Sequence, residues 1–107
     1  MSGSRSRRKG RAGEAAFKRV LVERDWDVVD TSSGIAECDL VGIKDGIVTA
    51  WEVKNARNLL IDAWLGQARV QAKGKRRWGL AMRLPGFPRY WLVLAQGREP
   101  QIWKGNE

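Results

Sequence analysis

The alternation of apolar and polar positions predicts helices and strands in a definite order along the chain. Apolar residues recur at helical spacing from about residue 11 to residue 25, and again from Asp62, a predicted N-cap, to about residue 75. Shorter apolar runs of strand character occupy residues 26–31, 38–44, 47–54, 78–84 and 89–95. The tail beyond them holds one short apolar patch, around Ile102 and Trp103. The order α-β-β-β-α-β-β predicts an α/β (α+β) fold with a mixed central β-sheet flanked by helices.

Residues 38–54 are predicted to form a β-hairpin that places two acids side by side. Asp45-Gly46 separates its two apolar runs, and this dipeptide favours a type I′ turn, whose central residues both need a positive φ. Counting outward from the turn places Asp39 opposite Glu52, unless a one-residue bulge shifts the register. Cross-strand neighbours lie about 5 Å apart at Cβ, so two carboxylates at these positions repel each other and require compensation.

The hairpin also brings a lysine to the same face of the sheet. Period-2 alternation puts Lys54 on the side of Glu52, whereas Trp51 and Val53 point into the expected core. Hard divalent cations such as Mg²⁺ take carboxylate oxygens together with water and substrate phosphates, so Asp39, Glu52 and Lys54 indicate a metal that binds phosphate. The alternative is a solvated surface cluster in which Lys54 only pairs with Glu52.

Three other positions are open to two interpretations. Glu14 stands at the edge of the apolar arc of the first helix, where it either leans toward a site or stabilises the first helical turn. Ser33, in the loop ahead of the hairpin, either approaches a phosphate or simply turns the chain. Arg83, at the end of the strand 78–84, is expected to face the site or the phosphates of a ligand.

Composition limits the chemistry. The chain has 107 residues, which corresponds to one domain. It has one cysteine and no histidine, so a disulfide framework and the usual zinc sites are excluded and any metal must be held by oxygen ligands. No apolar run approaches a membrane span, and no signal-peptide pattern follows the basic start, so an intracellular, cytoplasmic protein is expected. Leu59, Leu60 and six tryptophans exceed the evident needs of one core and predict a dimer interface.

The charge distribution indicates a polyanionic partner. The net charge is +8, and neutralising phosphates releases counterions and so drives binding. Residues 1–10 are predicted to be a basic, flexible arm and residues 11–107 a single domain, and no acid occurs between Asp62 and Glu99. The candidate nucleic-acid-binding residues are Arg5, Arg7, Arg8, Lys9, Arg11, Ser33, Arg69, Lys73, Lys75, Arg76, Arg77 and Arg83.

These residues resemble a known pattern. Glu14 on a first helix, Asp39 on a strand and then Glu52-x-Lys54 resemble the PD-(D/E)XK nuclease superfamily. More narrowly, the chain is similar from about residue 9 to residue 103 to the small archaeal-type Holliday-junction resolvases and their phage-encoded relatives. The resemblance implies a restriction-endonuclease-like fold.

The resemblance also implies roles for individual residues. Glu14, Asp39 and Glu52 would bind Mg²⁺ or Mn²⁺, Lys54 would assist the attacking water, and Gln67 on the second helix would lie near the site. The implied protein is a homodimer that resolves four-way DNA junctions by paired phosphodiester hydrolysis. Two alternatives remain open: another nuclease of this fold, of the nicking, flap, repair or restriction type, or a non-catalytic nucleic-acid-binding module.

Overall fold

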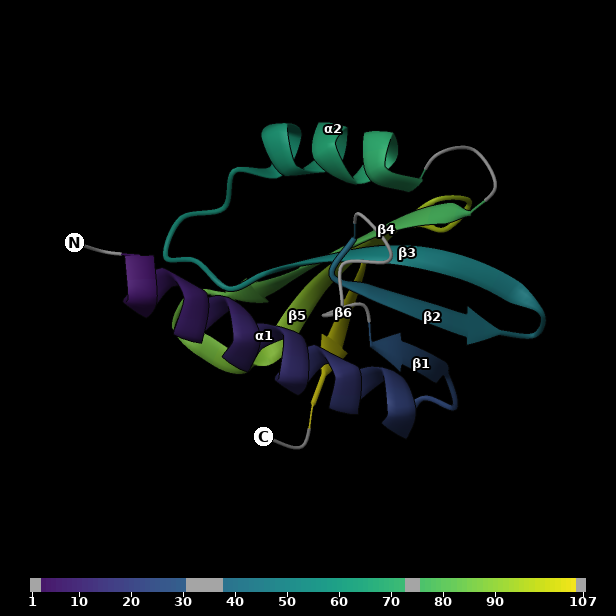
Figure 1. Ribbon diagram of the computed structural model, residues 1–107, viewed down its shortest axis with the longest axis horizontal. Helices are drawn as coiled ribbons and strands as arrows, with labels where there is room; N and C mark the ends of the chain where they lie inside the picture. Colours follow the sequence, from purple (N-terminus) through teal and green to yellow (C-terminus); the bar gives the residue numbers. More distant parts are fainter. Residues whose placement is uncertain (1–2, 31–37, 73–75, 106–107) are drawn as a thin grey trace.

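The structure is a computed structural model that describes residues 3–30, 38–72 and 76–105. Two helices lie on opposite sides of a central sheet (Figure 1). The elements are α1 (Gly3–Glu23), β1 (Asp27–Asp30), β2 (Leu40–Lys44), β3 (Ile47–Lys54), α2 (Ile61–Ala72), β4 (Arg77–Leu84), β5 (Phe87–Ala95) and β6 (Gln101–Lys104). In the described part of the chain, neither helix is long and apolar enough to cross a membrane.

The sheet is mixed, as the sequence predicts. Its strands lie in the order β1-β2-β3-β4-β5-β6, with β3 and β4 parallel and every other neighbouring pair antiparallel. The parallel pair is joined through α2, because parallel neighbours need a crossover connection. The predicted order lacked β6, which pairs with β5 from Tyr90 to Val93 and uses the apolar patch at Ile102 and Trp103 as an edge strand.

Two boundaries differ from the prediction. Helix α1 begins at Gly3 instead of about residue 11, so residues 3–10, expected to be a flexible arm, form its first turns. Arginine and lysine are good helix formers, which allows a segment without apolar periodicity to continue a helix. Helix α2 begins at Ile61, so Asp62 lies within its first turn instead of capping it, where a negative charge is still favourable.

Each face of the sheet carries its own core. On the α1 face, Trp51 is fully buried with its ring 5.1 Å from that of Phe17, and Trp91 and Trp103 complete this cluster. On the α2 face, Ala68 packs against strand residues in a second cluster. Four of the six tryptophans are buried in the first cluster, so the two cores account for most of the apolar excess that predicted a dimer interface.

A glycine makes the α1-side core possible. A Cβ atom at Gly79 would lie 2.5 Å from Cε3 of Trp51, closer than real contacts allow. The absent side chain lets the indole lie flat on the neighbouring strand. The alternation along β3 then directs Glu52 and Lys54 to the α2 face of the sheet.

Candidate active site

The hairpin forms with the predicted register. Strands β2 and β3 pair from Lys44 opposite Ile47 to Leu40 opposite Trp51. The turn residues Asp45 and Gly46 have φ values of 53° and 76°, as their turn type requires. The next position beyond the paired strands brings the segment at residue 39 beside the segment at residue 52, so the predicted neighbourhood of the two acids is confirmed.

The Asp39 carboxylate is fixed by the backbone of the facing strand. The main-chain N–H of Val53 donates a hydrogen bond of 2.8 Å to Oδ2 of Asp39, and the N–H of Asp39 donates to the carbonyl of Trp51 at 3.1 Å. These two bonds tie the residue to β3 on both sides of Glu52. The side chain is only partly exposed, so its carboxylate is held at the end of β2 in a defined place.

Glu52 is an acid buried where water cannot stabilise its charge. It is 3% exposed, and this burial, followed by the negative charge of Asp39, raises the pKa of Glu52 from 4.5 to about 8. The positive charge of Lys54 opposes this rise, whereas a hydrogen bond with Asp39 and the charge of Glu14 add to it. Near neutral pH, Glu52 therefore holds a proton unless further positive charge enters the site.

Lys54 lies beside Glu52 as the period-2 pattern predicts. Its Nζ is 3.9 Å from Oε2 of Glu52 and 5.8 Å from the ring centroid of Trp64 on α2. The side chain is 24% exposed, so it connects the buried acid with solvent. An ammonium group in this position is suited to bind an anion or a water molecule close to the two carboxylates.

Glu14 reaches the site because α1 approaches β3 closely. A Cβ atom at Gly13 would lie 2.8 Å from Cβ of Asn55, the first residue after β3. The missing side chain at Gly13 therefore lets the helix contact the chain where it leaves the sheet. Glu14 follows directly and lines one cleft with Asp39 and Lys54, so the structure favours the site over the helix-turn interpretation.

This cleft, which we call the acid cleft, has a volume of about 470 Å³. The residues that line it include Gly10, Glu14, Asp39, Lys54, Asn55 and Arg57. Asn55 and Arg57 are not among the candidates that the sequence predicts. Only their position in the sequence identifies them. They directly follow β3, which carries Glu52 and Lys54, so they leave the sheet at the end where these two residues lie.

The acid cleft offers oxygen ligands that suit a hard cation. These ligands are not yet arranged around a metal position. Among the described residues, no group of three or more His, Cys, Asp or Glu side chains is arranged to hold a metal ion. Asp39 and Glu14 nevertheless line the cleft with carboxylate oxygens, the ligands that Mg²⁺ prefers, and the carboxyl group of Glu52 is buried beside that of Asp39. A divalent cation would also offset the charge of Asp39, which adds to the effect of burial in raising the pKa of Glu52. The residues therefore fit Mg²⁺ chemically.

Two predicted site residues do not line the acid cleft itself. Gln67 is exposed on α2 and is not among the residues that line the acid cleft; the neighbouring Gln71 is the one whose Oε1 is buried. Arg83 lies on the α1 face of the sheet, opposite to Lys54, with its guanidinium carbon 4.9 Å from the ring centroid of Trp91. A polar residue that is close to Glu52 or Lys54 in the predicted order of elements can therefore face away from them in the fold.

The candidate phosphate-binding residues are spread over several elements. Arg11, Arg69, Arg76 and Arg77 are exposed. Arg77 is in register with Thr49, at the opposite end of β3 from Lys54, and its Nη1 donates to the carbonyl of Gln96 at 3.4 Å. Ser33, Lys73 and Lys75 lie outside the described residues, as do the side chains of Arg5, Arg7, Arg8 and Lys9.

Cys38 lies within electrostatic range of Arg76 and of both acids. Burial raises the pKa of the Cys38 thiol, and the charge of Arg76 opposes that rise, whereas Glu52 and Asp39 add to it. Arg76 and the two carboxylates therefore act on the same buried thiol.

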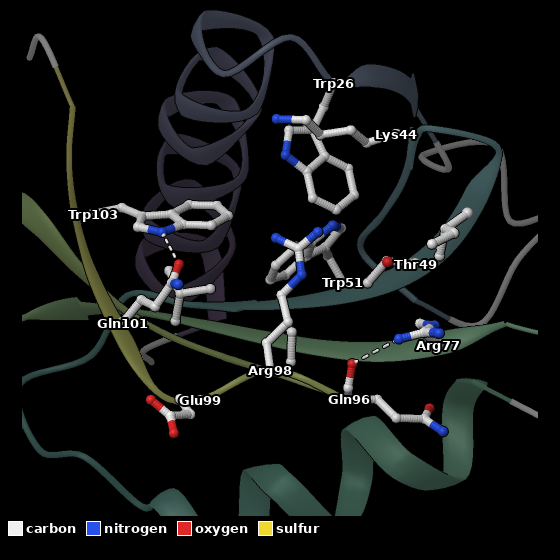
Figure 2. A pocket seen from close by; sticks show the side chains of 13 residues that line it. Trp26, Lys44, Thr49, Trp51, Arg77, Gln96, Arg98, Glu99, Gln101 and Trp103 are labelled. Carbon is white, nitrogen blue, oxygen red and sulfur yellow. Dashed lines mark hydrogen bonds between the residues drawn. The ribbon is translucent and has the colours of Figure 1, made fainter.

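A second pocket lies on the α1 face at the other end of β3 (Figure 2). Trp26, Trp51 and Trp103 line it, and Arg98 extends across it. The Nε1 of Trp103 donates to Oε1 of Gln101 at 2.8 Å, so part of its polar lining is internally satisfied. Its volume is about 20 Å³, room for a water molecule but not for a substrate, so the acid cleft is the better candidate site.

The comparisons with known proteins add no relative. No protein-family model matches the chain, and no curated protein or solved structure gives a significant match. The function therefore has to be argued from the chemistry of the acid cleft.

Proposed function

We propose that this protein is a metal-dependent endonuclease of the PD-(D/E)XK type that hydrolyses phosphodiester bonds of DNA. The observation that carries the proposal is the pairing of Asp39 with Glu52, which is buried directly behind a cleft that Glu14, Asp39 and Lys54 line. A buried acid facing a second acid is unfavourable for stability, so its presence points to a bound cation. The net charge of +8 supports a polyanionic substrate.

Glu14, Asp39, Glu52 and Lys54 each have a role in this proposal. Asp39 and Glu52, with Glu14, would hold Mg²⁺ or Mn²⁺, and the bound cation would stabilise the charge that develops on the phosphate. Asp39 is oriented by its bond to the Val53 N–H. Lys54, 3.9 Å from Glu52, would orient the attacking water or take its proton.

The four-way DNA junction is the substrate that the resemblance to the junction resolvases favours. A junction of near two-fold symmetry suits a homodimer, whose two sites are related by a two-fold axis and cut opposing strands. Leu60, one of the residues expected at a dimer interface, is 59% exposed, whereas Leu59 packs against the core on the α2 face. An exposed leucine next to α2 is compatible with a second copy at this place.

Incubation with a synthetic four-way junction tests the proposal. Linear duplex, a nicked duplex and a flap are incubated alongside it, with Mg²⁺ or with a chelator, and products are separated on a denaturing gel. Paired symmetric cuts confined to the junction and dependent on metal are expected. If the flap or the duplex is cut instead, the protein is still a nuclease, but the four-way junction is not its substrate.

A non-catalytic nucleic-acid-binding module is the second candidate. It is favoured by the absence, among the described residues, of acids already arranged around a metal ion, and by the contact of Lys54 with Glu52. This candidate predicts binding that is independent of metal and no cut in any DNA. The same gel decides between the two functions, with a mobility-shift assay to verify that the DNA is bound.

A further inference from the structure

The acid cleft continues into a second depression. This turn pocket has a volume of about 270 Å³, and Asn55, Ala56 and Arg57 line both of them. On its other side it is bounded by Arg83 and by Pro85 and Gly86 in the β4–β5 turn. The two hollows are therefore neighbours that share one wall, formed by the chain directly after β3.

The shared wall carries a positive charge in the same cleft as Asp39 and Lys54. Arg57 is exposed and follows Lys54 by three residues, so their Cα atoms are at most about 11 Å apart. A guanidinium offers several N–H donors in a planar fork that matches a phosphate. Arg57 can thus reach a phosphate adjoining one that is bound at the acids.

Both ends of this path are open. A Cβ atom at Gly10, in the acid cleft, or at Gly86, in the turn pocket, would meet no atom within 4 Å. Lys54 and Arg57 line the path, and Arg83 borders its far end. An extended anionic chain can therefore enter at α1 and leave at the β4–β5 turn.

We propose that the acid cleft and the turn pocket form one groove for a single phosphodiester backbone, in which Arg57 binds the phosphate next to the one that is cut. The inference rests on the proposed function, because the acids define which phosphate is cut. Arg57 is a positioning residue, since it contacts the substrate strand and not the reacting atoms.

The test compares Arg57→Ala and Arg57→Lys with Arg98→Ala. Arg98 is a matched control, because it is also exposed and lies at the other end of the sheet with its guanidinium 5.7 Å from the Trp26 ring. Affinity for a fluorescent four-way junction is measured by anisotropy in chelator, where no cut occurs. We expect roughly tenfold weaker binding for Arg57→Ala, partial recovery for Arg57→Lys and little change for Arg98→Ala.

A second measurement identifies the phosphate. Single phosphates around the branch point are replaced in turn by neutral methylphosphonates, and each junction is titrated with the wild type and with Arg57→Ala. One position, adjacent to the cut mapped with the wild type, should weaken wild-type binding and leave Arg57→Ala unaffected. If Arg57→Ala behaves like Arg98→Ala, or if no position couples to it, the groove assignment is overturned.

The two experiments distinguish an error in the groove assignment from an error in the proposed nuclease function. Metal-dependent cuts by the wild type without coupling at Arg57 would overturn the groove and support the proposed function. Coupling at Arg57 with no cut in any DNA would support the groove as a binding site and overturn the proposed function.

Discussion

The backbone N–H of Val53 donates a 2.8 Å hydrogen bond to the carboxylate of Asp39, and this bond joins the two strands beside the buried Glu52. The hairpin thus uses its own main chain to hold one acid close to another. The bond fixes the orientation of the Asp39 carboxylate. A mutation of Asp39 to asparagine can therefore remove the negative charge and still allow this hydrogen bond.

Asp39→Asn is expected to abolish cleavage of the junction while the fold persists. The amide oxygen can still accept the Val53 N–H, but the negative charge needed to hold a cation is lost. We expect a reduction of roughly 100-fold or more in the cleavage rate, with DNA binding retained. Gel assays measure the rate, and thermal unfolding checks the fold. Wild-type turnover in this variant would contradict the assignment of the site.

The stability of the protein is expected to fall as the pH rises toward 8. Between its ordinary pKa of 4.5 and its folded pKa of about 8, Glu52 holds an extra proton in the folded state only. The free energy of unfolding therefore decreases as pH rises through this window. Denaturant unfolding at pH 5 to 9 should show this loss for the wild type and a smaller one for Glu52→Gln. Equal slopes for both proteins would show that Glu52 ionises normally.

Mg²⁺ is expected to stabilise the protein more at pH 8 than at pH 5. A cation that binds only the folded state raises the unfolding temperature by an amount that grows with the ratio of its concentration to its dissociation constant, and it binds the ionised acids. Because the pKa of Glu52 is raised to about 8, protons compete with the cation at low pH. Thermal melts with and without Mg²⁺ measure this, and Asp39→Asn should show no shift. A shift of the same size at both pH values would argue against binding at Glu52.

Local chemistry explains why the hairpin and its acids could be predicted. Asp45 and Gly46 specify the turn, and once the turn is known the pairing of every residue along both strands follows by counting. Period-2 alternation then gives the face of Lys54. The hairpin can therefore be predicted from its local sequence alone.

Other parts of the site depend on packing that no local pattern specifies. The face of Gln67 depends on the phase of α2, where a shift of one residue rotates a side chain by about 100°. Arg83 turns to the α1 face because its strand pairs in a particular register with β3. Arg57 carries no periodic signal at all, and only the fold brings it to the acid cleft.

Gly13→Ala is expected to destabilise the protein and to impair cleavage, whereas Gly10→Ala should be stabilising. A Cβ atom at Gly13 would lie 2.8 Å from Asn55, but one at Gly10 would meet nothing within 4 Å. Alanine in a helix gains about 1 kcal/mol over glycine, so the overpacking at Gly13 should appear as a difference of about 1–3 kcal/mol between the two variants. Denaturant unfolding measures this, and equal stabilities would contradict the close contact of α1 with β3.

Replacing Arg5, Arg7 and Arg8 by glutamine is expected to weaken DNA binding in a salt-dependent way. The backbone of α1 continues without interruption from these residues to Gly10 and Glu14 in the acid cleft, so in the proposed function this basic segment would adjoin the bound DNA. Each phosphate contact that is lost should reduce the slope of log affinity against log salt by about 0.9. Titrations at several salt concentrations measure the slope, and circular dichroism verifies that α1 persists, since glutamine is also a good helix former. An unchanged slope would show that the start of α1 does not contact phosphates.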